Sequence, residues 1–136
     1  MTLPVNLLAP TAGLILIASG VAKAFDFGEA ATMIQITLVA FPPWSQVVAV
    51  ATIALELVAG FSLALRPAAP LGRVVGTALA SGFAGFNLVH IARHIQVPCK
   101  CFGALFTASP GVMLAIDGLL VALIWAGQPK APPPAG

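Results

Sequence analysis

Long apolar segments separated by short polar ones dominate this chain, and no stretch shows the polar and apolar alternation of a β-strand. A bilayer core about 30 Å thick is crossed by roughly 17–25 apolar residues of helix. Segments of about that length, bounded by charge or proline, are approximately Pro4–Ala22, Trp44–Leu65, Val74–Ala92 and Pro110–Gly127. Since helices satisfy their backbone hydrogen bonds internally, the pattern predicts an all-α protein, an integral membrane four-helix bundle.

Two further segments complete the predicted organisation. Ala30–Ala40 is apolar but would form only about 17 Å of helix at 1.5 Å per residue, which is too short to cross. We expect a short interfacial or partly inserted helix there, between the first two spans; the alternative is a tilted first span that continues past Lys23. Gln128–Gly136 is rich in proline, which disfavours helix and sheet, so we expect a disordered tail after a membrane domain of residues 1–127.

Composition supports a lipid environment. Of 136 residues, 60% are hydrophobic and 7% are charged, whereas an ordinary soluble domain has roughly 25% charged residues. Six Lys and Arg and four Asp and Glu are too few to cover a water-exposed surface. The net charge of +2 is also too small for a nucleic-acid-binding surface, so we expect no nucleic acid partner.

The basic residues indicate an orientation. Four spans place both termini and the loop Arg66–Arg73 on one side, with Lys23–Pro43 and Arg93–Ser109 on the other. Each side carries three basic residues, counting Lys and Arg together. The loop Arg66–Arg73, however, contains no acidic residue, and its two arginines lie near span ends. The positive-inside rule therefore places this loop and both termini in the cytoplasm of a multi-pass inner (plasma) membrane protein. Residues 93–109, here called the cysteine loop, would then be extracytoplasmic.

The entire thiol content of the chain is Cys99 and Cys101, one residue apart in the cysteine loop. A disulfide between them would close a very small, strained ring that exchanges readily. Lys100 and Arg93 supply positive charge that stabilises a thiolate, the reactive form. The pattern favours a reactive pair over two inert packed cysteines, and it indicates no cofactor beyond a redox-active disulfide.

Metal binding is a second interpretation of the same region. His90 and His94 lie four residues apart and would share a helix face, which with Cys99 and Cys101 makes a potential Cys2His2 set. Cysteines spaced by one residue are less usual for zinc and suit copper(I) better. Both metals remain open at this point.

A third interpretation is a non-catalytic assembly subunit. Small residues recur at helical spacing in the third span, as Ala78 with Gly82 and Ser81 with Gly85. Such residues let helix backbones approach closely, either within a compact bundle or against a partner membrane protein.

Ionisable residues inside membrane spans are costly and are therefore functional candidates. Glu56 lies near the middle of the second span and should face the bundle interior. Asp117, Asn87 and His90 lie at comparable depth and would form one polar cluster beneath the cysteine loop. Lys23, at the end of the first span, would reach inward to Glu56 or Asp117, or extend to the lipid headgroups.

Three short motifs carry a family resemblance. They are Ser19-Gly20-Val-Ala-Lys23-Ala-Phe-Asp26, Leu55-Glu56-Leu-Val-Ala-Gly60 and Pro98-Cys99-Lys-Cys101-Phe102-Gly103. With these motifs, the chain resembles the MauE/DoxX-like membrane proteins over about residues 5–127. The resemblance implies a four-helix membrane protein of extracytoplasmic disulfide chemistry, with Cys99 and Cys101 as the redox pair and Lys23, Glu56 and Asp117 as supporting residues. It also implies thiol–disulfide oxidoreductase activity toward a separate thioredoxin-like or disulfide-containing partner.

Overall fold

The computed structural model describes residues 7–98, 100 and 102–126, and its regular elements are helices. These residues form α1 (Leu8–Phe25), α2 (Phe27–Leu38), α3 (Pro42–Leu65), α4 (Pro70–Ala92), the 3-10 turn η2 (Gly103–Leu105) and α5 (Pro110–Ala126). No β-strand occurs among them, so the all-α prediction is confirmed. Cys99, Cys101 and the predicted tail lie outside the described residues.

Three of these helices, α1, α3 and α4, are long and apolar enough to cross a membrane. The helix α5 is also apolar but has 17 residues, about 25 Å at 1.5 Å per residue. Length and composition thus indicate a multi-pass protein in a lipid bilayer with three membrane-spanning helices, and the fourth span remains a prediction.

Proline determines where three of the helices begin. Pro42, Pro70 and Pro110 each occupy the first turn of a helix, where a missing N–H leaves no intrahelical bond unmade. As a result, α3 and α4 begin two and four residues earlier than the apolar pattern predicts. The first helix continues through Lys23 to Phe25, so this lysine lies within α1 and does not end it.

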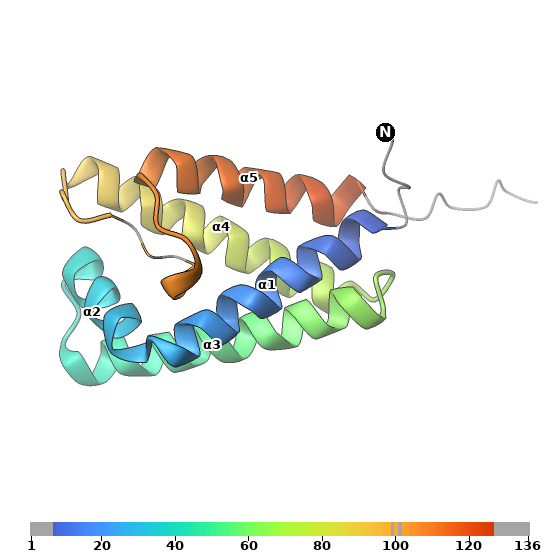
Figure 1. Cartoon of the computed structure of the whole chain (residues 1–136), viewed down its shortest axis with the longest axis horizontal. Helices are drawn as coiled ribbons and strands as arrows, with labels where there is room; N and C mark the ends of the chain where they lie inside the picture. The colour runs from blue at the N-terminus through green and yellow to red at the C-terminus, as the bar shows by residue number, and fades with distance from the viewer. Residues whose placement is uncertain (1–6, 99, 101, 127–136) are drawn as a thin grey trace, which may run out of the picture.

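The four long helices lie side by side, and α2 covers one end of the bundle (Figure 1). The start of α1, the end of α5 and the α3–α4 connection lie at the opposite end, in agreement with the predicted two sides (Figure 1). The helix α2 packs back onto the bundle and buries Ala31, Met33 and Thr37. The predicted short helix is therefore confirmed, although it begins three residues before Ala30 and ends two before Ala40.

Backbone contact between α1 and α3 brings their polar residues together. A Cβ added at Gly13 would lie 2.6 Å from the carbonyl oxygen of Gly60, so only glycine fits there. In contrast, a Cβ added at Gly82 or Gly85 would meet nothing within 4 Å among the described residues. The prediction that the stripe of Ala78, Ser81, Gly82 and Gly85 packs closely within the bundle is therefore wrong. Their face is open, and the close approach occurs between α1 and α3.

Candidate functional site

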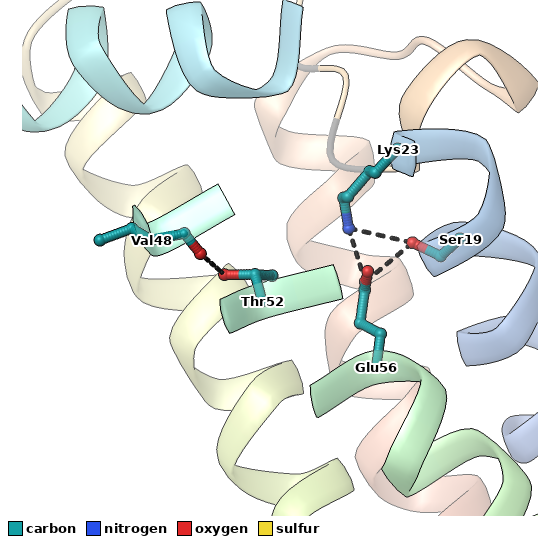
Figure 2. A network of polar contacts seen from close by, with 5 residues as sticks. All are labelled: Ser19, Lys23, Val48, Thr52 and Glu56. Carbon is teal, nitrogen blue, oxygen red and sulfur yellow. Dashed lines mark hydrogen bonds and ion pairs between the residues drawn. The ribbon is translucent and has the colours of Figure 1, made fainter. Parts of the chain in front are cut away.

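A buried ion pair joins α1 to α3. The Nζ atom of Lys23 lies 2.5 Å from Oε1 of Glu56 and donates to Oγ of Ser19 at 3.0 Å. The Ser19 hydroxyl donates to the same Oε1 at 2.9 Å, which closes a triangle of polar contacts (Figure 2). The exposed fractions of Ser19, Lys23 and Glu56 are 1%, 6% and 0%. Of the alternatives for Lys23, the structure thus shows the inward one, with Glu56 as its partner.

Local helix geometry explains this arrangement. Ser19 and Lys23 are four residues apart on α1 and therefore share one face. Gly20 lies against Glu56, because a Cβ added there would stand 3.3 Å from the Glu56 Cβ. The ammonium of Lys23 also lies 4.3 Å from the centre of the Phe83 ring on α4, a cation–π contact. The second carboxylate oxygen of Glu56, Oε2, is buried without a hydrogen-bond partner among the described residues.

A second polar contact joins α4 to α5. The side-chain amide of Asn87 donates to Oδ2 of Asp117 at 2.9 Å and to the carbonyl oxygen of Phe83 at 3.0 Å. Asn87 and Asp117 are both buried. The other carboxylate oxygen, Oδ1, is buried and has no hydrogen-bond partner within the described part of the chain. Two of the three residues predicted to cluster here are thus in contact.

The third residue of that predicted cluster, His90, makes its hydrogen bonds elsewhere. Its Nε2 atom donates to the carbonyl oxygen of Val97 at 2.7 Å, since a carbonyl can only accept. Its Nδ1 atom lies 3.3 Å from the Thr37 hydroxyl on α2. His90 is fully buried, so it connects α4 to α2 and to the cysteine loop. A metal ion at His90 would have to displace one of these partners.

The expectation that His90 and His94 share a helix face is wrong. The helix α4 ends at Ala92, and His94 follows it with a left-handed φ of 51° and an exposed side chain. Among the described residues, no three His, Cys, Asp or Glu side chains are grouped as metal ligands. Since the two cysteines lie outside these residues, the Cys2His2 set stays a prediction.

The two cations predicted to serve a thiolate are bound to α2. The guanidinium of Arg93 donates to the carbonyl oxygens of Thr37 at 2.6 Å and Ile36 at 3.4 Å, near the C-terminal end of α2. Arg93 therefore caps carbonyls that lack an intrahelical partner. Lys100 forms an ion pair with Glu29 at the start of α2, with both side chains partly exposed. Their effect on the thiols stays a prediction.

The residues that follow Cys101 are anchored on α1. Gly103 has a left-handed φ of 62°, and a Cβ added there would lie 2.7 Å from Ala22 C and 2.8 Å from Lys23 N. Phe102 is buried, and the N–H of Gly103 donates to the carbonyl oxygen of Lys100 at 2.9 Å. Gly103 of the Phe-Gly segment therefore packs against the backbone of the lysine that forms the buried ion pair.

Sequence reasoning missed two polar partners, Ser19 and Thr37. Ser19 carried a usable signal, because it lies one helical turn before Lys23. Thr37 carried none, because its contact with His90 depends on how α2 folds back onto α4.

Comparisons with known proteins give one match. The model of a family described as methylamine utilisation protein MauE matches residues 1–128, which include all five α-helices. The DoxX part of the predicted resemblance has no counterpart in this match. No curated protein and no solved structure matches the chain.

Proposed function

Because this chain belongs to the MauE family, we propose that it is a membrane thiol–disulfide redox protein that acts in methylamine utilisation. It exchanges redox equivalents with an extracytoplasmic protein through Cys99 and Cys101. One cysteine thiolate attacks a disulfide of the partner, and the other resolves the mixed disulfide. The partner gains two electrons and two protons, and the cysteine pair becomes a disulfide; the reverse reaction oxidises a partner dithiol.

One observation carries this proposal: the packing of Gly103 against α1 at Ala22 and Lys23. The most distinctive motif of the chain is Cys-x-Cys-Phe-Gly, and its glycine, Gly103, packs against Lys23, which forms the buried ion pair. A membrane protein retains a buried Lys–Glu pair at a considerable energetic cost, which favours a function for it. The contact links the predicted thiol chemistry to these ionisable residues.

Lys23, Glu56 and Asp117 support the exchange by moving protons. The two protons that leave the thiols end on the partner, so ionisable groups near the cysteine loop can relay them during the exchange. Buried carboxylate oxygens at Glu56 and Asp117 lack hydrogen-bond partners among the described residues, so each has room for a proton.

The membrane arrangement completes the proposal. With 17 residues, α5 lies at the short end of the range for a transmembrane helix, and we assign it as the fourth span. Both termini and the loop Arg66–Arg73 are cytoplasmic, and the cysteine loop is extracytoplasmic, where disulfides persist. The observed grouping of connections at two opposite ends of the bundle supports the division into two sides (Figure 1). The choice of the cytoplasmic side rests on the positive-inside rule applied to Arg66 and Arg73.

Thiol labelling in intact cells tests the function and the orientation together. We expect that, in a fraction of the protein molecules, a membrane-impermeant maleimide mass tag labels the cysteines only after a reductant has been added. A pair that is never oxidised in cells, or that is labelled only after permeabilisation, would overturn the proposal.

Two further variants sharpen this experiment. With Cys99→Ser or Cys101→Ser, we expect the remaining thiol to accumulate a mixed disulfide with its partner protein. The orientation control is Ala68→Cys in the double Cys99→Ser/Cys101→Ser background, because Ala68 is exposed in the opposite α3–α4 connection. This cysteine should be labelled only in permeabilised cells.

A further inference from the structure

An apolar cavity of about 480 Å³ lies between α2, α3 and α4. Its α3 wall contains Val48, Ala49, Thr52 and Leu55, and its α4 wall includes Ala78 and Gly82. This volume lies within the range of roughly 300–1,000 Å³ that is usual for small-molecule sites.

Small side chains on facing helices hold the cavity open. Ala78 and Gly82 are four residues apart on α4, and Ala49 and Thr52 are three apart on α3, so each pair lies on one helix face. The Thr52 hydroxyl donates to the Val48 carbonyl oxygen of its own helix at 2.8 Å (Figure 2). This hydroxyl on the α3 wall is therefore already hydrogen-bonded and does not need a polar ligand in the cavity. Of the small residues of the third span, Ala78 and Gly82 thus form part of a wall of this cavity.

The cavity opens toward the membrane. Val48, Leu55 and Val74 line it and are also 40%, 45% and 64% exposed, so the walls continue onto the outer surface of α3 and α4. Both helices are long and apolar enough to span a bilayer. Because its lining is mostly apolar, a cavity at that place admits a lipid-soluble molecule more readily than water.

The cavity has a polar but electrically balanced end. Lys23 and Lys100 both line it, and Lys23 is paired with Glu56 while Lys100 is paired with Glu29. Because each ammonium already has a carboxylate, the end suits a neutral hydrogen-bond acceptor better than an anionic lipid phosphate. An ammonium has three donors, so Lys23 can bind a carbonyl oxygen in addition to its present partners.

We infer that this cavity binds a lipid-soluble quinone. The ring lies at the polar end, where a carbonyl oxygen accepts a hydrogen bond from Lys23, and the apolar chain leaves past Gly82 between α3 and α4. This inference rests on the proposed function in the direction that oxidises a partner dithiol, because the cysteine pair is then left reduced and needs a two-electron acceptor. Two S–H bonds break and one S–S bond forms, and two electrons and two protons pass to the quinone oxygens to give the quinol.

Direct binding to the purified full chain tests the inference. In phosphatidylcholine nanodiscs, we expect decylubiquinone to bind saturably at one site by isothermal titration calorimetry. Gly82→Leu fills the cavity and should weaken binding at least tenfold, as should Thr52→Phe from the opposite wall. Gly85→Leu is the matched control, because Gly85 is also on α4 with open space at its Cβ position but does not line the cavity. It should bind like the unchanged protein, and thermal unfolding of each variant verifies its fold.

Three results would overturn the inference: no saturable binding, equal binding by folded Gly82→Leu and Gly85→Leu, or a retained phospholipid that decylubiquinone does not displace. If the proposed thiol function is wrong but the binding site is right, the experiments give a different set of results. The Cys99→Ser/Cys101→Ser variant should still bind decylubiquinone, which would support the site. Binding by a protein whose cysteines never oxidise in cells would contradict the redox function and not the binding site.

Discussion

Replacing Lys23 by Met removes the ammonium that neutralises Glu56 inside the bundle and keeps a long, largely apolar side chain. The variant loses the 2.5 Å contact with Glu56 and the 3.0 Å bond to Ser19. Removal of one partner from a buried ion pair costs about 3–5 kcal/mol, because the other charge stays buried without compensation. Glu56→Met leaves the ammonium unpaired in the same way and should cost a similar amount.

The double variant Lys23→Met/Glu56→Met should be more stable than either single variant. No charge remains in the interior, and apolar side chains of similar volume fill the space. Such replacements are often close to neutral, so we expect a loss below about 2 kcal/mol. The two substitutions are then strongly non-additive, with a coupling energy of about 4 kcal/mol or more.

Equilibrium unfolding in mixed detergent micelles, followed by far-UV circular dichroism, measures these free energies. The matched control is Glu29→Gln, which removes the partner of Lys100 from an ion pair whose side chains are 33% and 50% exposed. That substitution should cost less than about 1 kcal/mol. A double-variant loss equal to the sum of the single losses would refute the reasoning, as would a Glu29→Gln loss as large as that of Lys23→Met.

Four further outcomes are expected. Gly13→Ala should lower the free energy of unfolding by about 1–3 kcal/mol in the same assay, since its Cβ meets the Gly60 carbonyl oxygen, whereas Gly82→Ala, in open space, should not. Gly103→Ala combines a left-handed φ with a clash against α1, and hydrogen exchange should show residues 102–106 released. His90→Ala removes the bond to Val97 and should speed exchange in residues 93–98 while α1 and α3 remain protected. Anaerobically purified protein should contain no stoichiometric copper or zinc by elemental analysis.

Each of these outcomes has a contrary result. Equal stability of Gly13→Ala and Gly82→Ala would contradict the backbone contact between α1 and α3. Unchanged hydrogen exchange in Gly103→Ala would contradict the anchoring of the cysteine loop on α1. Faster hydrogen exchange throughout His90→Ala would show that His90 stabilises the whole bundle and not only residues 93–98. Stoichiometric metal that disappears in the Cys99→Ser/Cys101→Ser variant would favour the metal interpretation over thiol exchange.

The sequence by itself determined the class of the fold. Apolar segments of a length set by the bilayer, with few charges, can satisfy their backbone only as helices, so α1, α3, α4 and α5 follow from local composition. The inward orientation of Glu56 follows from the same reasoning, because a charge facing lipid is costly. Helix starts were less accurate, since Pro42 and Pro70 begin helices within polar connections that the apolar pattern does not mark.

Only the tertiary structure decided the partners. Whether Lys23 meets Glu56 or Asp117 depends on the rotation of α1 against α3, which the contact of Gly13 with Gly60 sets. The pairing of Lys100 with Glu29 depends on α2 folding back onto the bundle. From the sequence alone, a small residue such as Gly82 is equally consistent with close helix packing and with a cavity. The arrangement of α2, α3 and α4 makes them the wall of a cavity, because helix spacing is a property of the whole bundle and not of one segment.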